Sequence, residues 1–380
     1  MVIFLASSHS LKQGDTVGII GGGQLGQMLA LSAKEMGAKV IVLDPDETCP
    51  TGQVADQQIV AKYNDFSALE RLAKMSDVLT YEFENVDLNA LEHLTNERKL
   101  PQGVELLKIT KNRAAEKGFL QKHGLKTAPF EIVNTKDELE EAVSKIGFPS
   151  ILKTCEGGYD GKSQFTLTSK EDIDKASELL TQGQCILEGF VVFSLECSVM
   201  VAQNANDETT VFPVSENIHK NHILHESIVP ARISEELQEK AQKAALKIAQ
   251  RLHLRGILGV EFFVGKDNEL YVNELAPRPH NSGHYSIEAC DFSQFDIHDR
   301  AIMNWPLPKI ELLKPAVMVN ILGQHKEGSE ALILEKPKWH FHDYGKKDVR
   351  VDRKMGHVTI LTDDLEKTLA EIDDTRIWTK

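Results

Sequence analysis

Residues 273–284 have the sequence Asn-Glu-Leu-Ala-Pro-Arg-Pro-His-Asn-Ser-Gly-His. From Ala276 onward, two prolines stiffen a segment that carries a guanidinium, two imidazoles and an amide. These donors suit a small oxyanion such as bicarbonate or a carboxylate. Because loops that concentrate such groups are more often functional than structural, we expect this stretch to line a binding site.

The residues that precede this stretch predict a hairpin. Val260 to Val264 and Glu269 to Asn273 are strand-like and are joined by Gly265 to Asn268. A four-residue connection would place Glu261 and Glu274 on one sheet face as diagonal neighbours, whereas an odd connection would turn one acid away. Two carboxylates on one face could hold magnesium, with phosphate oxygens completing the octahedron. A pair of solvated strand acids is the alternative interpretation.

A glycine-rich loop upstream offers a second set of phosphate ligands. Lys153 is followed by Gly157-Gly158-Tyr159-Asp160-Gly161-Lys162, so an ammonium group stands on either side of a flexible loop. Such a loop can close over a polyphosphate while the lysines offset its charge. The spacing is not that of a P-loop, because the required first glycine is missing. A surface hairpin with solvated lysines is the alternative.

The first hundred residues predict a parallel α/β sheet. Thr16 to Ile20, Lys39 to Leu43 and Asp77 to Tyr81 are strand-like, and Gln24 to Met36 has a helical pattern closed by Gly37. Strands that alternate with helices in this way are typical of βαβ units.

The loop between the first strand and the first helix is Gly21-Gly22-Gly23-Gln24-Leu25-Gly26, and Asp44 ends the next strand. This spacing matches the dinucleotide-binding fingerprint. Glycines there let backbone N–H groups approach any anion at a helix start, so a nucleotide monophosphate fits equally well. From the loop alone, a dinucleotide, another phosphate ligand and a purely structural turn all stay open.

Downstream, the pattern predicts a smaller α/β segment and then a β-rich tail. A Lys/Arg-rich helix is expected over Lys108 to Lys122, and capped helices are expected after Thr135 and Ser169. Gln164 to Thr168 is strand-like, and Glu235 to Leu252 has the apolar face of a core-packing helix.

The composition limits the classes of function. The chain has 380 residues, enough for two or three domains, and its 41% apolar and 26% charged residues are globular values. A net charge of −14 disfavours nucleic acid and anionic membranes as partners. The five cysteines are widely spaced and form no Cys-x-x-Cys pair, and neither a long apolar stretch nor a signal peptide is evident. We therefore expect a soluble cytoplasmic protein.

Five blocks taken together resemble one family. They are Gly21–Gly26, Tyr81–Asn85, Gly157–Lys162, Asn273–His284 and Arg353–His357. The family is that of the N5-carboxyaminoimidazole ribonucleotide synthetases, ATP-grasp enzymes of purine biosynthesis, and the resemblance runs from about residue 14 to about residue 362. Its most specific block is Asn273–His284, whereas the first glycine loop is weak by itself.

The resemblance implies a three-part α/β and α+β chain. The expected parts are a Rossmann-like parallel-sheet domain over 1–105, an ATP-grasp domain over 106–310 with a lid at about 117–187, and a small β-rich domain over 311–380. It also implies a homodimer that uses ATP and Mg²⁺, with Mn²⁺ able to replace the magnesium. Bicarbonate would be phosphorylated to carboxyphosphate, which would carboxylate the amine of 5-aminoimidazole ribonucleotide. Because carboxyphosphate is short-lived in water, such chemistry requires a closed cavity and a lid.

The resemblance further assigns roles to individual residues. The ATP positions are Arg113, Lys153, Gly158, Tyr159, Asp160, Gly161, Lys162, Ser163, Gln164, Glu188, Gly189, Phe190, Val191, Glu196, His219, Asn273 and Glu274. Magnesium is expected on Glu261 and Glu274. The ribonucleotide positions are Gly23, Gln24, Leu25, Glu82, Asn85, Tyr159, Asp160, Arg353 and Lys354, so that the first glycine loop would hold the 5′-phosphate. The catalytic positions are Arg278, His280 and Asn281 around bicarbonate, and Asp160, which would accept the amine proton.

Three other interpretations compete with this one. A nicotinamide-dependent oxidoreductase would use only the first loop and Asp44, and it leaves the acid pair without a role. Formate-dependent glycinamide ribonucleotide formylating enzymes would share the ATP site, and Arg353–His357 is the stretch that discriminates against them. A catalytically silent nucleotide sensor is favoured only by departures from the family pattern at Cys155, Glu156 and Gly189. These departures, with Ser163 as a fourth, bear on ATP affinity more than on reaction type.

Glu274→Gln should abolish magnesium-dependent turnover while the fold survives, because the substitution removes one of the two anionic ligands of a hard cation. Steady-state rates and a thermal unfolding curve would check this prediction. A wild-type rate in the variant would remove the metal assignment.

Overall fold

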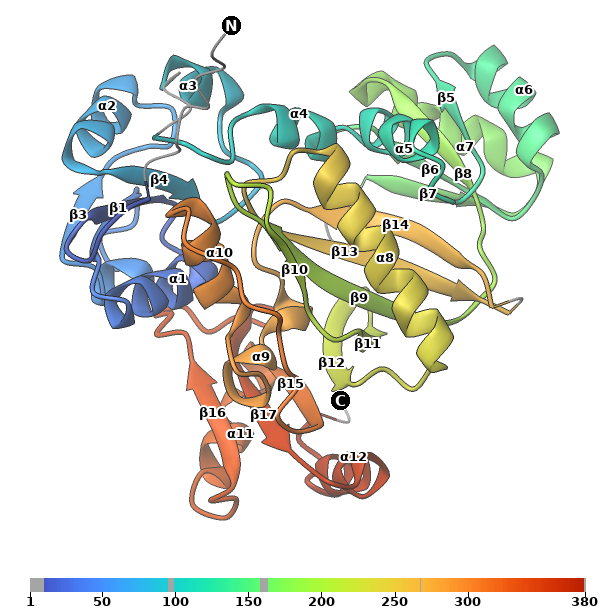
Figure 1. Ribbon diagram of the computed structural model, residues 1–380. Coiled ribbons are helices and arrows are strands. Elements are labelled where there is room, and N and C mark those ends of the chain that lie inside the picture. Colours follow the sequence, from blue (N-terminus) through green and yellow to red (C-terminus); the bar gives the residue numbers. More distant parts are fainter. Residues whose placement is uncertain (1–9, 95–98, 158–162, 267, 379–380) are drawn as a thin grey trace, which may run out of the picture.

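The computed structural model describes residues 10–94, 99–157, 163–266 and 268–378, and within them the chain forms three sheets (Figure 1). A four-stranded parallel sheet lies in the N-terminal part, and a four-stranded antiparallel sheet lies within residues 130–189. A nine-stranded sheet runs through the rest of the chain. The expected α/β architecture with a Rossmann-like beginning is therefore confirmed.

The N-terminal sheet has the strand order β3-β2-β1-β4. Its strands are β1 (Thr16–Ile20), β2 (Lys39–Asp44), β3 (Gln57–Val60) and β4 (Val78–Tyr81). Val17 and Ile19 face α1 (Gln24–Glu35), whereas Ile20 faces α2 (Phe66–Met75) and α3 (Leu88–His93). Both faces of the sheet are covered, as a parallel sheet requires. The predicted strands and first helix are confirmed to within a residue.

The predicted basic helix over Lys108 to Lys122 is two helices, α4 (Glu105–Lys111) and α5 (Arg113–Lys122). The break falls at Asn112, whose backbone is extended and whose side chain accepts a hydrogen bond from the Ala115 amide. Asparagine is a strong N-cap because its short side chain satisfies a free amide at a helix start. The prediction of one helix was therefore wrong, and the break places Arg113 on the first turn of α5.

The antiparallel sheet of residues 130–189 has the order β5-β8-β6-β7 and lies almost entirely within the range where the lid was expected. Its elements are β5 (Phe130–Val133), α6 (Lys136–Ile146), β6 (Ser150–Thr154), β7 (Gln164–Leu167), η2 (Lys170–Asp172), α7 (Ile173–Ser177), η3 (Glu178–Gln182) and β8 (Cys185–Gly189). Thr135 caps α6 as expected. The helix expected after Ser169 is divided into short 3₁₀ and α segments.

The nine-stranded sheet has the order β14-β13-β9-β11-β12-β15-β17-β16, with β10 paired to β9. Its strands are β9 (Phe193–Gln203), β10 (Thr209–Val211), β11 (Ser215–Lys220), β12 (Ile223–Val229), β13 (Gly256–Gly265), β14 (Leu270–Ala276), β15 (Ala316–Leu322), β16 (Trp339–Asp343) and β17 (Lys354–Leu361). Because β12 pairs with β15, the C-terminal strands continue the central sheet without a break.

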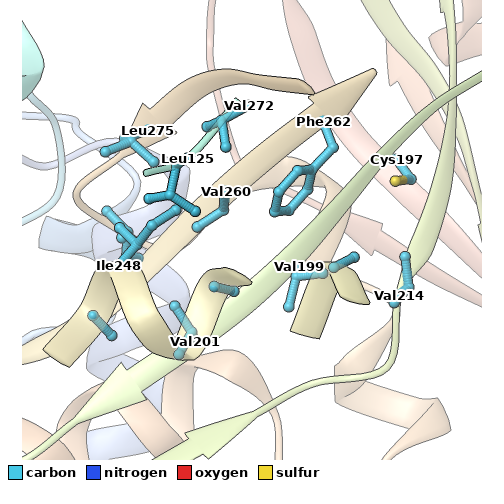
Figure 2. Packing of buried hydrophobic residues seen from close by; sticks show 14 of the residues in the cluster. Leu125, Cys197, Val199, Val201, Val214, Ile248, Val260, Phe262, Val272 and Leu275 are labelled. Carbon is cyan, nitrogen blue, oxygen red and sulfur yellow. The ribbon is translucent and has the colours of Figure 1, made fainter. Parts of the chain in front are cut away.

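Most of the remaining helices pack around this sheet, whereas η1 (Thr51–Gln53) packs against α1. The others are α8 (Glu235–Arg251), η4 (Asn281–Gly283), α9 (Ser286–Ala289), α10 (Gln294–Ile302), η5 (Gly323–His325), α11 (Lys326–Leu332) and α12 (Leu365–Asp374). Figure 2 shows Ile248 of α8 packed against Val201 and Val260, which come from β9 and β13. The expected core role of α8 is confirmed, and its buried face contains Ala245 and Ala249 as well.

Candidate active site

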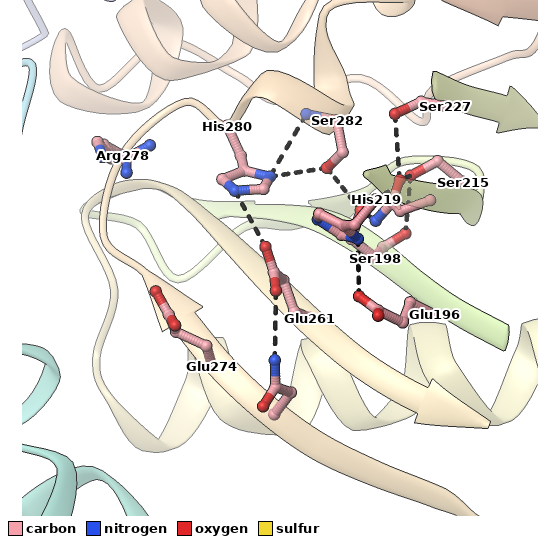
Figure 3. A network of polar contacts seen from close by, with 12 residues as sticks. Glu196, Ser198, Ser215, His219, Ser227, Glu261, Glu274, Arg278, His280 and Ser282 are labelled. Carbon is pink, nitrogen blue, oxygen red and sulfur yellow. Dashed lines mark hydrogen bonds and ion pairs between the residues drawn. The ribbon is translucent and has the colours of Figure 1, made fainter. Parts of the chain in front are cut away.

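The hairpin of β13 and β14 places two carboxylates side by side (Figure 3). Glu261 stands directly opposite Glu274, not diagonally as an even connection predicted. The Gly265 amide donates to the Glu269 carbonyl, so three residues connect the two strands. A connection of this odd length would by itself turn the Glu274 side chain to the opposite face of the sheet. A bulge with Asn273 as the extra residue corrects the register and returns Glu274 to the face of Glu261.

The surroundings of the two acids differ. Burial would raise the pKa of Glu261, but a contact of 3.1 Å from His280 Nε2 outweighs it and lowers that pKa well below its usual range. The Glu274 side chain is 51% exposed and has Arg113 Nη1 at 4.0 Å from its Oε2 atom. Loss of hydration by the surrounding protein and the Glu261 charge nevertheless raise the pKa of Glu274. Glu261 is therefore compensated by the protein, whereas Glu274 is the acid at which a cation would relieve repulsion.

The His280 imidazole is fixed by a chain of polar contacts. Its Nδ1 atom lies 2.7 Å from the Ser282 hydroxyl, which lies 2.6 Å from the Ser198 hydroxyl. Asn217 donates to the same Ser198 oxygen at 2.9 Å. Because both ring nitrogens of His280 have partners, the ring has one preferred orientation.

Glu196 of β9 and His219 of β11 form a second pair, with 2.8 Å between the Glu196 Oε2 and His219 Nδ1 atoms. Burial lowers the pKa of His219, but the hydrogen bond to Glu196 outweighs it and the net pKa is raised. Figure 3 shows this pair beside the Ser198 network. Glu196 and His219, both predicted to contact ATP, therefore lie on neighbouring strands, close to the acid pair.

Arg278 connects the loop after β14 to the N-terminal sheet. Its Nε and Nη2 atoms donate to the two oxygens of Glu84, which follows β4, and the Nη2 bond is 2.9 Å long. Burial would raise the pKa of Glu84, but the Arg278 charge brings it to about 2. A bidentate pair of this kind is strong and directional. It holds the loop after β4 against the loop after β14.

The antiparallel sheet of residues 130–189 and helix α5 together contribute a cluster of two lysines and one acid. Lys153 Nζ lies 2.7 Å from Glu188 Oε2, and Lys117 Nζ lies 3.6 Å from Glu188 Oε1. Lys117 also donates to the Asn273 carbonyl at 2.9 Å. The excess positive charge of this cluster suits a polyphosphate. Lys117 joins β8 to the β14 bulge.

The first glycine loop is occupied by internal carboxylates. Glu82 accepts from the amides of Gly23 at 2.5 Å and Gly26 at 2.8 Å, and Asp44 accepts from Gly22 at 2.6 Å. The fingerprint spacing thus serves the protein's own acids, and Asp44 is engaged where a dinucleotide ribose would need it. The amides of Gln24 and Leu25 have no partner within the helix, because they belong to its first turn.

A basic segment of the C-terminal part faces this loop. Gly345 accepts a hydrogen bond of 2.9 Å from the Gln53 side chain, so the segment touches the N-terminal part. Burial and the Arg353 charge lower the pKa of Lys346 to about 8, with smaller influences from Glu82 and Lys354. Lys346, Arg353 and Lys354 therefore form a local positive region on an acidic protein, as an anionic ligand requires.

The remaining predicted site residues lie at other positions in the fold or outside the described residues. Gly158, Tyr159, Asp160, Gly161 and Lys162 lie outside the described residues. Asn85 lines an open hollow of about 380 Å³ on the N-terminal part, together with Lys62 and Lys111. Asn281 is buried, and Gln164 pairs with Lys153. Gly189 ends β8, and Phe190 and Val191 follow it in the linker to β9.

The structure shows the local surroundings of two residues that depart from the family pattern, Ser163 and Cys155. Ser163 has a φ of +61°, a left-handed conformation that favours the glycine common at this position. Cys155 is 2% exposed and lies near the charges of Arg113 and Glu188. An arginine at position 155 would therefore enter a buried setting that already contains a guanidinium.

Sequence reasoning missed four residues of this region: Lys117, Glu84, Lys346 and Gln294. Lys117 follows Arg113 by one helical turn, and that spacing was a usable signal. Glu84 lay within a quoted motif but had no visible partner until Arg278 was placed beside it. Lys346 and Gln294 gave no local signal, because their neighbours come from distant parts of the chain.

The acid pair fits a magnesium ion in its donor chemistry. Within the described ranges, no group of three or more His, Cys, Asp or Glu side chains could hold a metal ion. Two carboxylates with the Asn273 amide nearby would therefore need oxygen ligands from a phosphate or water, which is how Mg²⁺ is commonly bound. Among the helices that the structure describes, none has the length and apolar character needed to cross a membrane.

Family models match three consecutive parts of the chain. A ribonucleotide synthetase preATP-grasp domain matches residues 15–111, and an ATP-grasp domain matches residues 118–295. A phosphoribosylaminoimidazole carboxylase C-terminal domain matches residues 316–371. With the acid hairpin and the paired lysines, these matches define the protein as a ligase of the ATP-grasp class.

Individual relatives narrow this class. The N5-carboxyaminoimidazole ribonucleotide synthase of Bacillus subtilis is 49% identical over 96% of each chain. A crystal structure of an N5-carboxyaminoimidazole ribonucleotide synthetase in its ADP complex has a TM-score of 0.94, 51% identity and 98% coverage of both chains. The Aspergillus clavatus enzyme in complex with ADP and 5-aminoimidazole ribonucleotide has a TM-score of 0.90 and 32% identity over 97% of this chain and 99% of that one. The chain belongs to the N5-carboxyaminoimidazole ribonucleotide synthetase family.

Glu84→Gln should destabilise the protein at pH 7 by about 1–3 kcal/mol, because the half-buried Arg278 loses its charged partner. Since the pKa of Glu84 is lowered in the folded state, its contribution is fully present above the ordinary carboxyl pKa and is lost as the pH falls toward about 2. Denaturant unfolding at pH 7 and pH 3 would measure this difference, which should be smaller at pH 3.

The matched control is Glu105→Gln, which removes a solvent-exposed ion pair with Lys108. It should leave stability unchanged at both pH values. Equal stabilities of Glu84→Gln and wild type at pH 7 would show that the pair with Arg278 does not hold the two loops together.

Proposed function

We propose that this enzyme uses ATP to carboxylate the exocyclic amine of 5-aminoimidazole ribonucleotide with bicarbonate. ADP and phosphate are the other products, and carboxyphosphate is the intermediate. The observation that carries the proposal is the convergence of predicted ligand groups with charged residues that contact them. Arg113 approaches Glu274, Lys117 binds the Asn273 carbonyl, and Arg278 binds Glu84, so groups from the lid, the central sheet and the N-terminal sheet surround one site.

ATP lies between the lid and the central sheet in this proposal. Lys153 and Arg113 offset the phosphate charge, and the Glu188–Val191 segment holds the adenine. Glu196 accepts from the ribose hydroxyls, with His219 beside it. Glu261 and Glu274 hold Mg²⁺, which supplies charge neutralisation to the transferring phosphate. The lid residues Gly158–Lys162 complete the phosphate contacts.

Bicarbonate occupies the loop after β14. Arg278 presents a guanidinium to it, and His280 and Asn281 present further polar groups. Glu261 and Ser282 hold the His280 ring in one orientation beside the oxyanion. Asp160 on the lid accepts the amine proton as the carbon–nitrogen bond forms.

The ribonucleotide 5′-phosphate lies between the glycine loop and the basic C-terminal segment. Since Glu82 fixes Gly23 and Gly26, the adjacent amides of Gln24 and Leu25 are directed at the ligand as a helix start directs them. Lys346, Arg353 and Lys354 supply the balancing charge. The enzyme acts as a homodimer in the cytoplasm, where its five unpaired thiols are stable.

Phosphate release from ATP, with each cosubstrate omitted in turn, tests the reaction. We expect release to depend on 5-aminoimidazole ribonucleotide and to increase with bicarbonate. Equal release without the ribonucleotide would contradict the proposal, and tight binding of NADH in a fluorescence titration would favour the oxidoreductase instead.

The KM for the ribonucleotide should rise about tenfold between pH 7 and pH 9, because the Lys346 ammonium, with its pKa of about 8, is lost over that range. Lys346→Met should raise the KM at pH 7 and remove this pH dependence. The exposed neighbour Lys347 provides the control, since Lys347→Met should keep the wild-type profile. A rising KM that persists in Lys346→Met would exclude Lys346 as the titrating group.

A further inference from the structure

The side chain of Gln294, the first residue of α10, forms two hydrogen bonds with the backbone of His280. Its Oε1 atom accepts a hydrogen bond of 2.9 Å from the His280 amide, and its Nε2 atom donates one of 2.8 Å to the His280 carbonyl. The side-chain amide thus pairs with one residue as a peptide group of an antiparallel strand would. Gln294 is completely buried, so water cannot replace it in either bond.

Gln294 is itself held in one orientation. Its Nε2 atom lies 3.0 Å from Nδ1 of His284, and its backbone amide donates to the Ser286 hydroxyl at 2.9 Å. Burial lowers the pKa of His284 well below its usual range, so the imidazole is neutral. A neutral ring that accepts at Nδ1 carries its proton at Nε2, and this fixes which end of the Gln294 amide faces it.

Stacked imidazole rings from the C-terminal strands pack against His284, which contacts Gln294. The His284 ring lies 4.9 Å from the His357 ring of β17, which stacks at 4.2 Å on His342 of β16. Tyr344 bonds to His357 at 3.0 Å. His284 and His357 are completely buried. The stack therefore connects the Gln294 side chain to the part of the sheet that carries Lys354.

The Gln294 side chain packs closely against the loop from His280 to Gly283. A Cβ atom at Gly283 would lie 2.5 Å from the Gln294 Oε1 atom, so the glycine lets the amide reach His280. The loop from His280 to Gly283 and the Gln294 side chain are thus mutually fitted. No shift of Gln294 can occur without a shift of His280.

We propose that Gln294 is a positioning residue that holds His280 in place for reaction of the bicarbonate-derived group. This inference rests on the proposed role of His280. If Gln294 is removed, the amide and carbonyl of His280 lose their partners and the loop must move to find others. Displacements of about 1 Å in such groups are known to reduce rates by about 100-fold.

The test compares Gln294→Leu, Gln294→Glu and wild type in the full-length enzyme. Gln294→Leu should lower kcat/KM for bicarbonate by about 100-fold while the Kd for ADP stays within about threefold, because the ATP contacts are elsewhere. Gln242→Leu is the matched control, since that glutamine also donates to a backbone carbonyl, Phe212 O, but lies away from the loop. The control should keep the wild-type rate.

The Gln294→Glu variant should show a pH-dependent activity that a merely destabilised loop would not show. The ionised carboxylate can accept from the His280 amide but repels its carbonyl, whereas the protonated acid restores a donor at that position. The ratio of variant to wild-type activity should therefore rise as the pH is lowered. This variant is almost isosteric with wild type, so it also serves if Gln294→Leu fails to fold in a thermal unfolding assay.

A double variant shows whether Gln294 acts through His280. We expect Gln294→Leu/His280→Ala to be no slower than His280→Ala alone, because a positioning effect needs its target. Wild-type kcat/KM in Gln294→Leu, a pH-independent ratio for Gln294→Glu, or additive losses in the double variant would each overturn the inference. A wild-type rate in His280→Ala would instead overturn the proposed function.

Discussion

Two carboxylates on one sheet face impose the main electrostatic constraint on this protein. Like charges directly opposite each other in an antiparallel pair repel. Here Glu261 is compensated by His280 and the Asn273 amide, and Glu274 is approached by Arg113. Each compensating group comes from a different element, and each of those elements has its own anchor, such as the Asn112 cap before Arg113. The arrangement of α5, the β14 loop and the central sheet follows from that need.

The local pattern was sufficient to predict much of the fold. Apolar periodicity gave β1, α1, β2 and α8 nearly to the residue, because those elements bury one regular face. The family resemblance gave the reaction and the residues that carry it. Where a single side chain decides the backbone, the pattern failed. Asn112 broke a predicted helix by capping the next one, and a loop length together with a bulge set the register of Glu274.

Contacts between distant segments were beyond the reach of sequence reasoning. The glycine fingerprint is real in spacing, but its amides hold Glu82 and Asp44, which lie 59 and 22 positions along the chain from their partners. The pairing of Arg278 with Glu84 spans 194 positions. Such contacts depend on how sheets pack together, and no window of sequence contains both partners.

The unbroken sheet from β11 to β17 has a consequence for the choice of substrate. Three strand-to-strand steps separate His219 on β11 from Lys354 on β17, or about 14 Å across the sheet. Hydrogen-bonded strands do not change their separation, so this span is a fixed dimension of the molecule. Because His219 is assigned to ATP and Lys354 to the ribonucleotide, the span fixes how far apart the two substrates bind. We expect ribonucleotide analogues whose amine lies at a different distance from the anionic end to miss the group that ATP activates, even where the anionic end fits its own subsite.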